Sequence, residues 1–338
     1  MASEKPLPKV AILSIGDMGA GIARLLLAHS FPVATNVSNR SKDTQQRAAD
    51  AGITTLFKDD LGLVDWADVV LSVVPPADAA ATAQRVVDAL AFSKTHQDGQ
   101  DGSTLYYADM NAISPATCRD VAAMFARARA PVVFIDGCIL GGPPKAAAAA
   151  AAATTAAASE DDDASKTWKV PLCPTSGPSS LADIHPLLQS TLNARPISAD
   201  VGAASGLKMC FASLSKGFSA IAVQAFTTAH RLGVLEDLKS VLGERNPAKL
   251  KQAEGAITAM PPKAYRWVRE MEEISNTHSV DGGFGPELFA GAADVFRAVA
   301  QDTVLGQEKI GSRKRGLTVE DVAEAMSEGM DKKRKKTE

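Results

Sequence analysis

Short apolar runs alternate with stretches of helical periodicity over the first half of the chain. A parallel sheet produces this alternation, because a helix must return the chain to the same edge before each new strand. The runs are nearly continuous, as strands covered on both faces require. The predicted strands are Val10–Ile15, Val33–Ser38, Val69–Val74, Leu105–Asp109, Val132–Asp136 and Trp168–Pro171. The pattern therefore predicts an α/β domain built on a doubly wound parallel sheet.

The pattern changes after residue 200. Between Ser205 and Leu232 the sequence has no proline, and its apolar residues return every three or four positions. This is the spacing of a helix face, and it predicts a long, mostly buried helix. Trp267, Met271 and Ile274 repeat the spacing farther along the chain. We therefore expect two domains, an α/β domain over residues 7–200 and an all-α domain over residues 201–330.

Two segments have few apolar side chains to bury. Residues 146–166 contain a run of alanines followed by acidic residues, which predicts a low-complexity insert without a chemical role. Residues 331–338 carry the basic run Lys332–Lys336, and we expect a disordered, solvated tail. The same run is similar to a nuclear import signal, so a nuclear location is the alternative to the cytoplasmic one that we favour.

The composition of the chain indicates which kinds of molecule it binds. The formal net charge of −3 and the isoelectric point of about 6.0 argue against a surface built for nucleic acid or anionic membrane. The four cysteines are widely spaced and form no C-x-x-C pair, which favours a reducing compartment and no metal site. The N-terminus has no signal-peptide apolar region, and no uninterrupted apolar stretch approaches membrane-spanning length. We expect a soluble protein whose partners are small molecules.

A glycine turn follows the first predicted strand and leads directly into a helical sequence. In this context glycine lets the backbone approach a pyrophosphate, and the amides at the helix start point toward its negative charge. The turn residues are Gly16, Asp17, Met18 and Gly19. Ser14 occupies the position of the usual first glycine, so a purely structural turn is the alternative. The preferred interpretation is a Rossmann-type dinucleotide site.

The end of the second predicted strand bears on the choice of cofactor. Asn39, Arg40 and Ser41 follow it about twenty residues after the turn, and no acidic residue is present there. An acidic side chain would bind the ribose hydroxyls of NAD, whereas an arginine and a hydroxyl offer donors to a 2′-phosphate. The sequence therefore predicts NADP over NAD.

Five motifs in order resemble the superfamily of 6-phosphogluconate and 3-hydroxyisobutyrate dehydrogenases, also called β-hydroxyacid dehydrogenases. They are Ile15–Gly19, Val73–Pro76, Asp109–Pro115, Asp136–Gly142 and Gly202–Lys208. From Lys208 onward the chain looks like the C-terminal domain of putative phosphogluconate dehydrogenases. The resemblance covers most of the chain outside the alanine-rich insert and the tail.

The resemblance implies a role for each matching residue. Val74 and Pro75 lie beside the nicotinamide, and Asn111, where the family usually has serine, lies near both cofactor and substrate. Gly141 and Gly142 present backbone N–H groups to the substrate carboxylate, because residues without Cβ permit close approach. Lys208 transfers the proton.

Alcohol oxidation needs a hydride acceptor and a group that takes the hydroxyl proton. Burial of Lys208 at a domain interface and the positive charge of the oxidised cofactor would both lower the lysine pKa, as that role requires. Gly202 and Gly206 allow the lysine-bearing helix to pack closely against the cofactor cleft. The alternative is a lysine that extends from a buried helix to solvent.

The chain departs from the family one helical turn after the lysine, where Ala212 replaces the asparagine that holds the substrate hydroxyl. A methyl group cannot form a hydrogen bond. Ser215 at i+7 and Ser205 at i−3 fall near the lysine face and are the candidate replacements.

These observations predict an NADP-dependent oxidoreductase that transfers hydride between the nicotinamide C4 and a small hydroxy acid or carbonyl compound. An imine or ketone reductase on the same scaffold is one alternative. A catalytically inactive NADPH-binding interaction protein is the other. We also expect a homodimer, because the long apolar helix needs more cover than one small helical domain gives.

Overall fold

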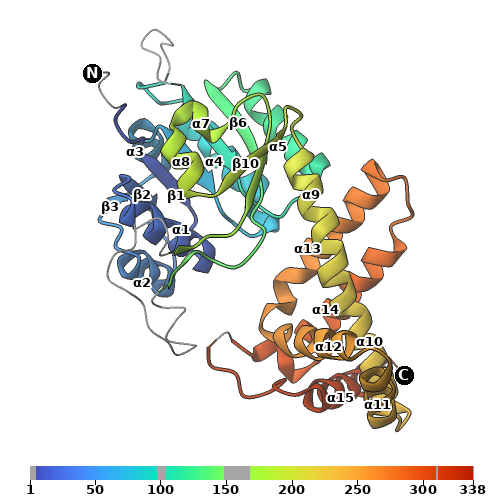
Figure 1. The fold of residues 1–338 in the computed structure, drawn as a ribbon. Helices are drawn as coiled ribbons and strands as arrows, with labels where there is room; N and C mark the ends of the chain where they lie inside the picture. Colours follow the sequence, from blue (N-terminus) through green and yellow to red (C-terminus); the bar gives the residue numbers. More distant parts are fainter. Residues whose placement is uncertain (1–4, 97–103, 148–167, 310, 338) are drawn as a thin grey trace. The chain divides into compact units, whose positions relative to one another are not determined.

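The computed structural model describes residues 5–96, 104–147, 168–309 and 311–337 (Figure 1). It divides into two compact units, Met1–Lys208 and Met209–Glu338, each treated by itself below. The division falls after Lys208 rather than after residue 200 as predicted. Most of the predicted alanine-rich insert lies outside the described residues.

The first unit is built on an eight-stranded sheet in the order β10-β9-β6-β5-β4-β1-β2-β3. The strands are β1 Val10–Leu13, β2 Val33–Asn36, β3 Thr55–Phe57, β4 Val69–Ser72, β5 Leu105–Asp109, β6 Val132–Gly137, β9 Cys173–Ser176 and β10 Ala194–Ser198. Neighbouring strands are parallel except β6 and β9, which pair antiparallel. The helices are α1 Asp17–Ala28, α2 Lys42–Asp50, α3 Asp60–Trp66, α4 Ala79–Leu90, α5 Pro115–Arg127, α7 Leu181–Ile184, α8 Pro186–Thr191 and the first part of α9 Ala203–Ala212.

Both faces of the sheet are covered, which confirms the doubly wound α/β prediction. In β1, Val10 and Ile12 belong to one buried cluster with α1 and α8, whereas Ala11 and Leu13 belong to another with α4 and α5. Alternate residues of a strand point to opposite faces, so a strand with two cores is apolar at every position. This requirement produced the nearly continuous runs.

The prediction that Trp168–Pro171 is a strand of the main sheet was wrong. Residues Trp168–Lys169 form β8, which pairs antiparallel with β7 Lys145–Ala146 in a separate two-stranded ribbon. The strand that joins the main sheet is β9, a few residues later. The sequence pattern also missed β3 and β10, because these edge strands are largely exposed and carry no continuous apolar run.

The described part of the second unit contains helices and no strand, which confirms the all-α prediction. After α9 and a π-helical turn, η3 Ser213–Gly217, come α10 Phe218–Arg231, α11 Leu235–Arg245, α12 Pro247–Ala259, α13 Ala264–Asn276, a second π-helical turn η5 Thr277–Asp281, α14 Glu287–Asp302 and α15 Val319–Thr337. The expected disordered tail is instead the end of α15. Ion pairs from Asp331 to Arg231 and from Lys333 to Asp302 attach it to the rest of the unit.

The long helical stretch Ala203–Arg231 is less buried than predicted. In its most apolar window 44% of the residues are buried, and Leu214 and Ile221 are 79% and 57% exposed. Among the described residues it is the one helix long and apolar enough to cross a membrane, a test that core helices of soluble proteins also pass.

Gly19→Ala should destabilise the first unit, because a Cβ there would clash with the Ser14 carbonyl oxygen. We expect the unfolding free energy to fall by about 1–3 kcal/mol, as for other overpacked sites. Gly16→Ala is the matched control, since a Cβ at Gly16 meets nothing within 4 Å. Thermal unfolding followed by circular dichroism checks both, and an equal melting temperature for the two variants would contradict the packing argument.

Candidate active site

A row of in-register residues crosses the carboxyl ends of the central strands. Leu13 pairs with Ser72, Ser72 with Asp109, Asp109 with Asp136, and Asp136 with Ser176. Residues paired in this way project to the same face of a sheet. Ligands of open α/β sheets bind beyond the carboxyl ends of the strands, so these polar side chains lie under the expected site.

The turn after β1 has the features of a phosphate site. Gly16 is the N-cap of α1, and no side chain caps the first N–H groups of that helix. A Cβ at Gly16 would enter open space, whereas one at Gly19 would strike the Ser14 carbonyl, so the helix packs closely while the turn stays accessible. Asp17 is exposed and Met18 packs on the core. Unsatisfied N–H groups and free space fit a pyrophosphate.

Arg47 braces this turn, a contact that sequence reasoning missed. Its Nε donates to the Ile15 carbonyl at 3.0 Å and its Nη2 to Thr44 Oγ1 at 2.9 Å. The arginine lies on α2, far from any motif in the sequence. Its cationic group is thus held beside the turn expected to bind phosphate.

The turn after β2 presents Arg40 to solvent. Asn39 adopts a left-handed conformation with φ of 59°, and the Arg40 N–H closes the turn on the Val37 carbonyl at 3.2 Å. Ser41 is the N-cap of α2, where its Oγ accepts from the Thr44 N–H at 3.3 Å. An exposed guanidinium beside a helix N-terminus fits a ribose phosphate.

Asn111 joins the ends of β4 and β5. Its Oδ1 accepts from the Val74 N–H at 2.7 Å, and its Nδ2 donates to Ser72 Oγ at 3.0 Å. An amide can accept and donate at once, which suits this bridging position. The side chain is buried, while Pro75 is exposed. Asn111 therefore fixes the loop that carries Val74 and Pro75, and its direct contact with cofactor or substrate stays a prediction.

Asp109 is a buried carboxyl that the sequence did not single out as functional. Its Oδ1 accepts from the Asn111 N–H at 3.0 Å, and its Oδ2 has no hydrogen-bond partner in the described part of the chain. Burial raises the pKa of Asp109 to about 7; the Asn111 N–H opposes this shift and the negative charge of Asp136 adds to it. A carboxyl in this environment retains its proton near neutral pH.

Lys208 forms a hydrogen bond with the segment that follows β6 and leads into the predicted substrate loop, Gly141–Gly142. Its Nζ donates to the Ile139 carbonyl at 2.6 Å, two residues before Gly141. Gly141 has φ of 146°, which favours glycine, and a Cβ at Gly142 would meet nothing within 4 Å. The half-buried lysine and both glycines thus belong to one corner of the first unit.

Two buried thiols lie within electrostatic reach of Lys208. Burial raises the pKa of the Cys138 and Cys173 thiols to about 12, and the positive charge of Lys208 acts in the opposite direction on both. The ammonium is therefore close enough to these thiols to act on them electrostatically. The thiols themselves are packing residues.

Both serines proposed to replace the family asparagine already donate a hydrogen bond within the chain. Ser205 is buried and donates through Oγ to Asp136 Oδ1 at 2.7 Å. Ser215 donates to the Ala212 carbonyl at 3.2 Å. It lies inside the π-helical turn η3, where the 3.6-residue spacing behind the i+7 argument does not hold. Substrate binding by Ser215 stays an untested prediction, and the helical spacing from which it was argued does not apply in this turn.

Two family models match parts of the chain. Residues 9–94 match the model described as NADP oxidoreductase, coenzyme F420-dependent, and residues 229–299 match a domain of unknown function, DUF1932. An uncharacterized 28.5 kDa protein of Methanothermus fervidus is 24% identical over 241 residues, 70% of this chain and 79% of that protein.

Solved structures share the fold. The 3-hydroxyisobutyrate dehydrogenase of Mycobacterium tuberculosis, solved with L-serine, is 19% identical with a TM-score of 0.61, and the match covers 94% of this chain and 99% of that one. A reductive aminase from Aspergillus terreus, solved with NADPH and ethyl levulinate, is 14% identical with a TM-score of 0.51 over 94% and 99%. The predicted resemblance to hydroxyacid dehydrogenases is confirmed in the fold, which is that of NAD(P)-dependent oxidoreductases.

Asp109→Asn should change how stability depends on pH. The folded pKa of about 7 is above the ordinary value of 3.8, so between these values the folded state binds more protons than the unfolded state. The unfolding free energy of the natural protein therefore falls as pH rises through this window, by up to about 4 kcal/mol from this group, and levels off above it. The asparagine variant lacks this contribution.

Urea unfolding of both proteins between pH 5 and pH 8 checks this expectation. The variant should gain stability relative to the natural protein as pH rises. Asp120→Asn, at an exposed carboxylate of α5, is the matched control. A constant difference between Asp109→Asn and the natural protein across the range would contradict the assignment.

Proposed function

We propose that the protein is an NADP-dependent oxidoreductase that acts on a small hydroxy acid or its carbonyl counterpart, with Lys208 as general acid and base. The observation that carries this proposal is the position of the Lys208 ammonium at Ile139, at the entrance to the Gly141–Gly142 loop. A proton-transferring group and a backbone able to approach a carboxylate are thereby adjacent.

A nicotinamide cofactor, when bound, would supply or accept the hydride. The residues of the chain hold the substrate and move the proton. The N–H groups at Gly141 and Gly142 bind the substrate carboxylate, since neither residue has a Cβ to keep it away. The Lys208 amine takes the hydroxyl proton during oxidation, and its ammonium returns a proton to the developing alkoxide during reduction.

The residues present fit NADP. The Gly16 turn offers open space and uncapped helix N–H groups to the pyrophosphate, and Arg47 adds positive charge beside it. Arg40 and Ser41 would hold the 2′-phosphate, and Val74 and Pro75 the nicotinamide side. Arginine binds phosphate through a fork of donors, which supports the choice of NADP over NAD.

Arg40→Ala should weaken NADPH binding and leave NADH binding unchanged. Loss of charge-assisted hydrogen bonds of about 1.5–3 kcal/mol corresponds to a roughly 10- to 100-fold higher dissociation constant. Isothermal titration with each cofactor measures this, and Arg127→Ala, at the exposed end of α5, is the control. Equal losses for NADPH and NADH would remove Arg40 from the 2′-phosphate site.

Lys208→Ala should abolish turnover while NADPH still binds. Loss of general acid–base catalysis costs roughly 10²- to 10⁴-fold in rate. Lys94→Ala, an exposed lysine after α4, is the control for the substitution. Stopped-flow turnover and fluorescence titration of NADPH separate the two effects. If the natural protein has no turnover with any tested substrate, the inactive NADPH-binding module becomes the better description.

An imine or ketone reductase remains the second candidate within the enzymes. The shared fold with a reductive aminase supports it. The lysine favours alcohol and carbonyl chemistry, because an ammonium group serves directly as the acid of carbonyl reduction. A screen of keto acids, aldehydes and cyclic imines, followed by loss of NADPH absorbance, distinguishes the two.

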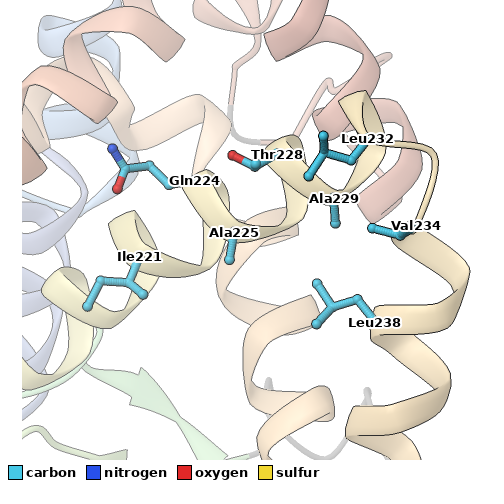
Figure 2. Close-up of a pocket in the computed structure, with 8 residues that line it drawn as sticks. All are labelled: Ile221, Gln224, Ala225, Thr228, Ala229, Leu232, Val234 and Leu238. Carbon is cyan, nitrogen blue, oxygen red and sulfur yellow. The ribbon is translucent and has the colours of Figure 1, made fainter.

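We further propose a cytoplasmic homodimer formed through the second unit. Figure 2 shows a mostly apolar groove along α10 and the start of α11. Its volume is about 700 Å³, and Ile221 and Leu232 at its sides are 57% and 71% exposed. The small side chains of Ala225 and Ala229 would let a helix of a second copy approach closely, and a two-fold contact would cover both grooves at once.

Ala225→Arg should convert the dimer to a monomer, because a charged side chain would fill the groove and resist burial in the interface. Multi-angle light scattering at micromolar concentration measures the mass of each form. Arg127→Ala serves again as the control. A monomeric natural protein under these conditions would exclude this interface.

A further inference from the structure

The carboxylate of Asp136, at the end of β6, is surrounded by hydrogen-bond donors. Its Oδ2 accepts from Ser176 Oγ at 2.7 Å and from the backbone N–H groups of Gly202, Ala204 and Ser205 at 2.9, 3.0 and 3.1 Å. Its Oδ1 accepts from Ser205 Oγ at 2.7 Å. The residue is fully buried. Asp136 thus receives the N–H groups at the start of α9, the helix that carries Lys208.

The chemistry of this contact suits a carboxylate. A carboxylate accepts on both oxygens and donates on neither, so it can accept several hydrogen bonds at once. Its negative charge also complements the positive end of the helix dipole, and burial removes water as a competitor. Because Asp136 is in register with Asp109 on β5 and with Ser176 on β9, the sheet itself fixes its position.

The same segment of chain holds α9 at a second point. Asp136 binds the beginning of the helix, and Ile139, three residues farther along, accepts the hydrogen bond from Lys208 Nζ. Two attachments separated along a helix restrict its movement more than one attachment does. The hydrogen bonds from the start of α9 to Asp136 therefore help to place Lys208 within reach of the Ile139 carbonyl.

A third element keeps α9 close to the sheet. Gly202 adopts φ of 102°, and a Cβ there would lie 3.2 Å from Pro115 Cβ and from Arg119 Nη1. A Cβ at Gly206 would lie 3.4 Å from Pro115 Cγ. The glycines therefore bring α9 against the start of α5. The backbone N–H groups of α9 can reach a short aspartate only at this distance.

We propose that Asp136 is a positioning residue for Lys208: by anchoring the first turn of α9 it sets the place and the hydrogen bonding of the lysine ammonium. Asp136 is fully buried and both of its oxygens accept hydrogen bonds from the chain, so it would act through the lysine rather than on a bound molecule. Its effect on catalysis rests on the proposed function, whereas its effect on the lysine does not. Loss of the carboxylate lets the start of α9 move and releases Lys208 from Ile139.

The experiment measures the reactivity of Lys208 directly. The natural protein and its variants are treated with trinitrobenzenesulfonate between pH 6 and pH 10, and mass spectrometry follows labelling of Lys208 relative to Lys94. Asp136→Ala should raise the relative rate about tenfold, as expected when one or two net hydrogen bonds that hold a group are lost. Asp136→Asn preserves the shape and most acceptor contacts, and should restore the rate to within about threefold.

Milder variants cover a failure of Asp136→Ala to fold. Ser205→Ala and Ser176→Ala each remove one hydroxyl donor to Asp136, and each should raise Lys208 labelling about two- to threefold in a folded protein. A purely structural role would lower the melting temperature and leave the ratio of Lys208 to Lys94 labelling unchanged. An unchanged ratio in the folded variants overturns the proposal.

Turnover forms the second arm. Asp136→Ala should lower kcat about tenfold and shift the pH profile, with the KM for NADPH unchanged, because the Gly16 turn and Arg40 follow β1 and β2, which β4 and β5 separate from β6 in the sheet. If the natural protein shows no turnover, the proposed function fails, and the labelling result still decides whether Asp136 positions the lysine.

Discussion

The end of strand β6 holds helix α9 in place through hydrogen bonds. Asp136 gathers the N–H groups at the start of the helix, and Ile139, on the same short segment, accepts from Lys208. A buried carboxylate that met fewer donors would cost free energy, so the helix, the strand and the lysine are fixed together. The candidate chemistry depends on this arrangement, since a general acid acts only from a defined position.

Parallel topology explains why the other candidate residues gather nearby. Gly16, Val74, Asn111 and Asp136 follow or end β1, β4, β5 and β6, which are neighbours in the sheet. Parallel strands end at one edge, so four segments far apart in the sequence reach the same place. Asn111 then ties two of these loops together through Val74 and Ser72.

Two buried carboxyl groups, Asp109 and Asp136, lie at the carboxyl ends of the central strands. Asp109 and Asp136 are in register, yet their surroundings differ: Asp136 meets five donors, whereas Asp109 meets one and has a raised pKa. Asp136 is therefore the carboxyl that receives the N–H groups at the start of α9.

The sequence by itself determined the doubly wound sheet, the all-α second unit, the glycine turn and the choice of Lys208 as the candidate acid and base, because periodicity and motif order are local properties of the chain. Only the tertiary structure decided that Asp136 receives α9, that Arg47 braces the turn and that Ser205 is already bonded. Each of these depends on residues separated by more than thirty positions, whose meeting is set by strand order and register. The edge strands β3 and β10 and the helical end of α15 were missed for a related reason, since exposed elements are stabilised by neighbours rather than by their own pattern.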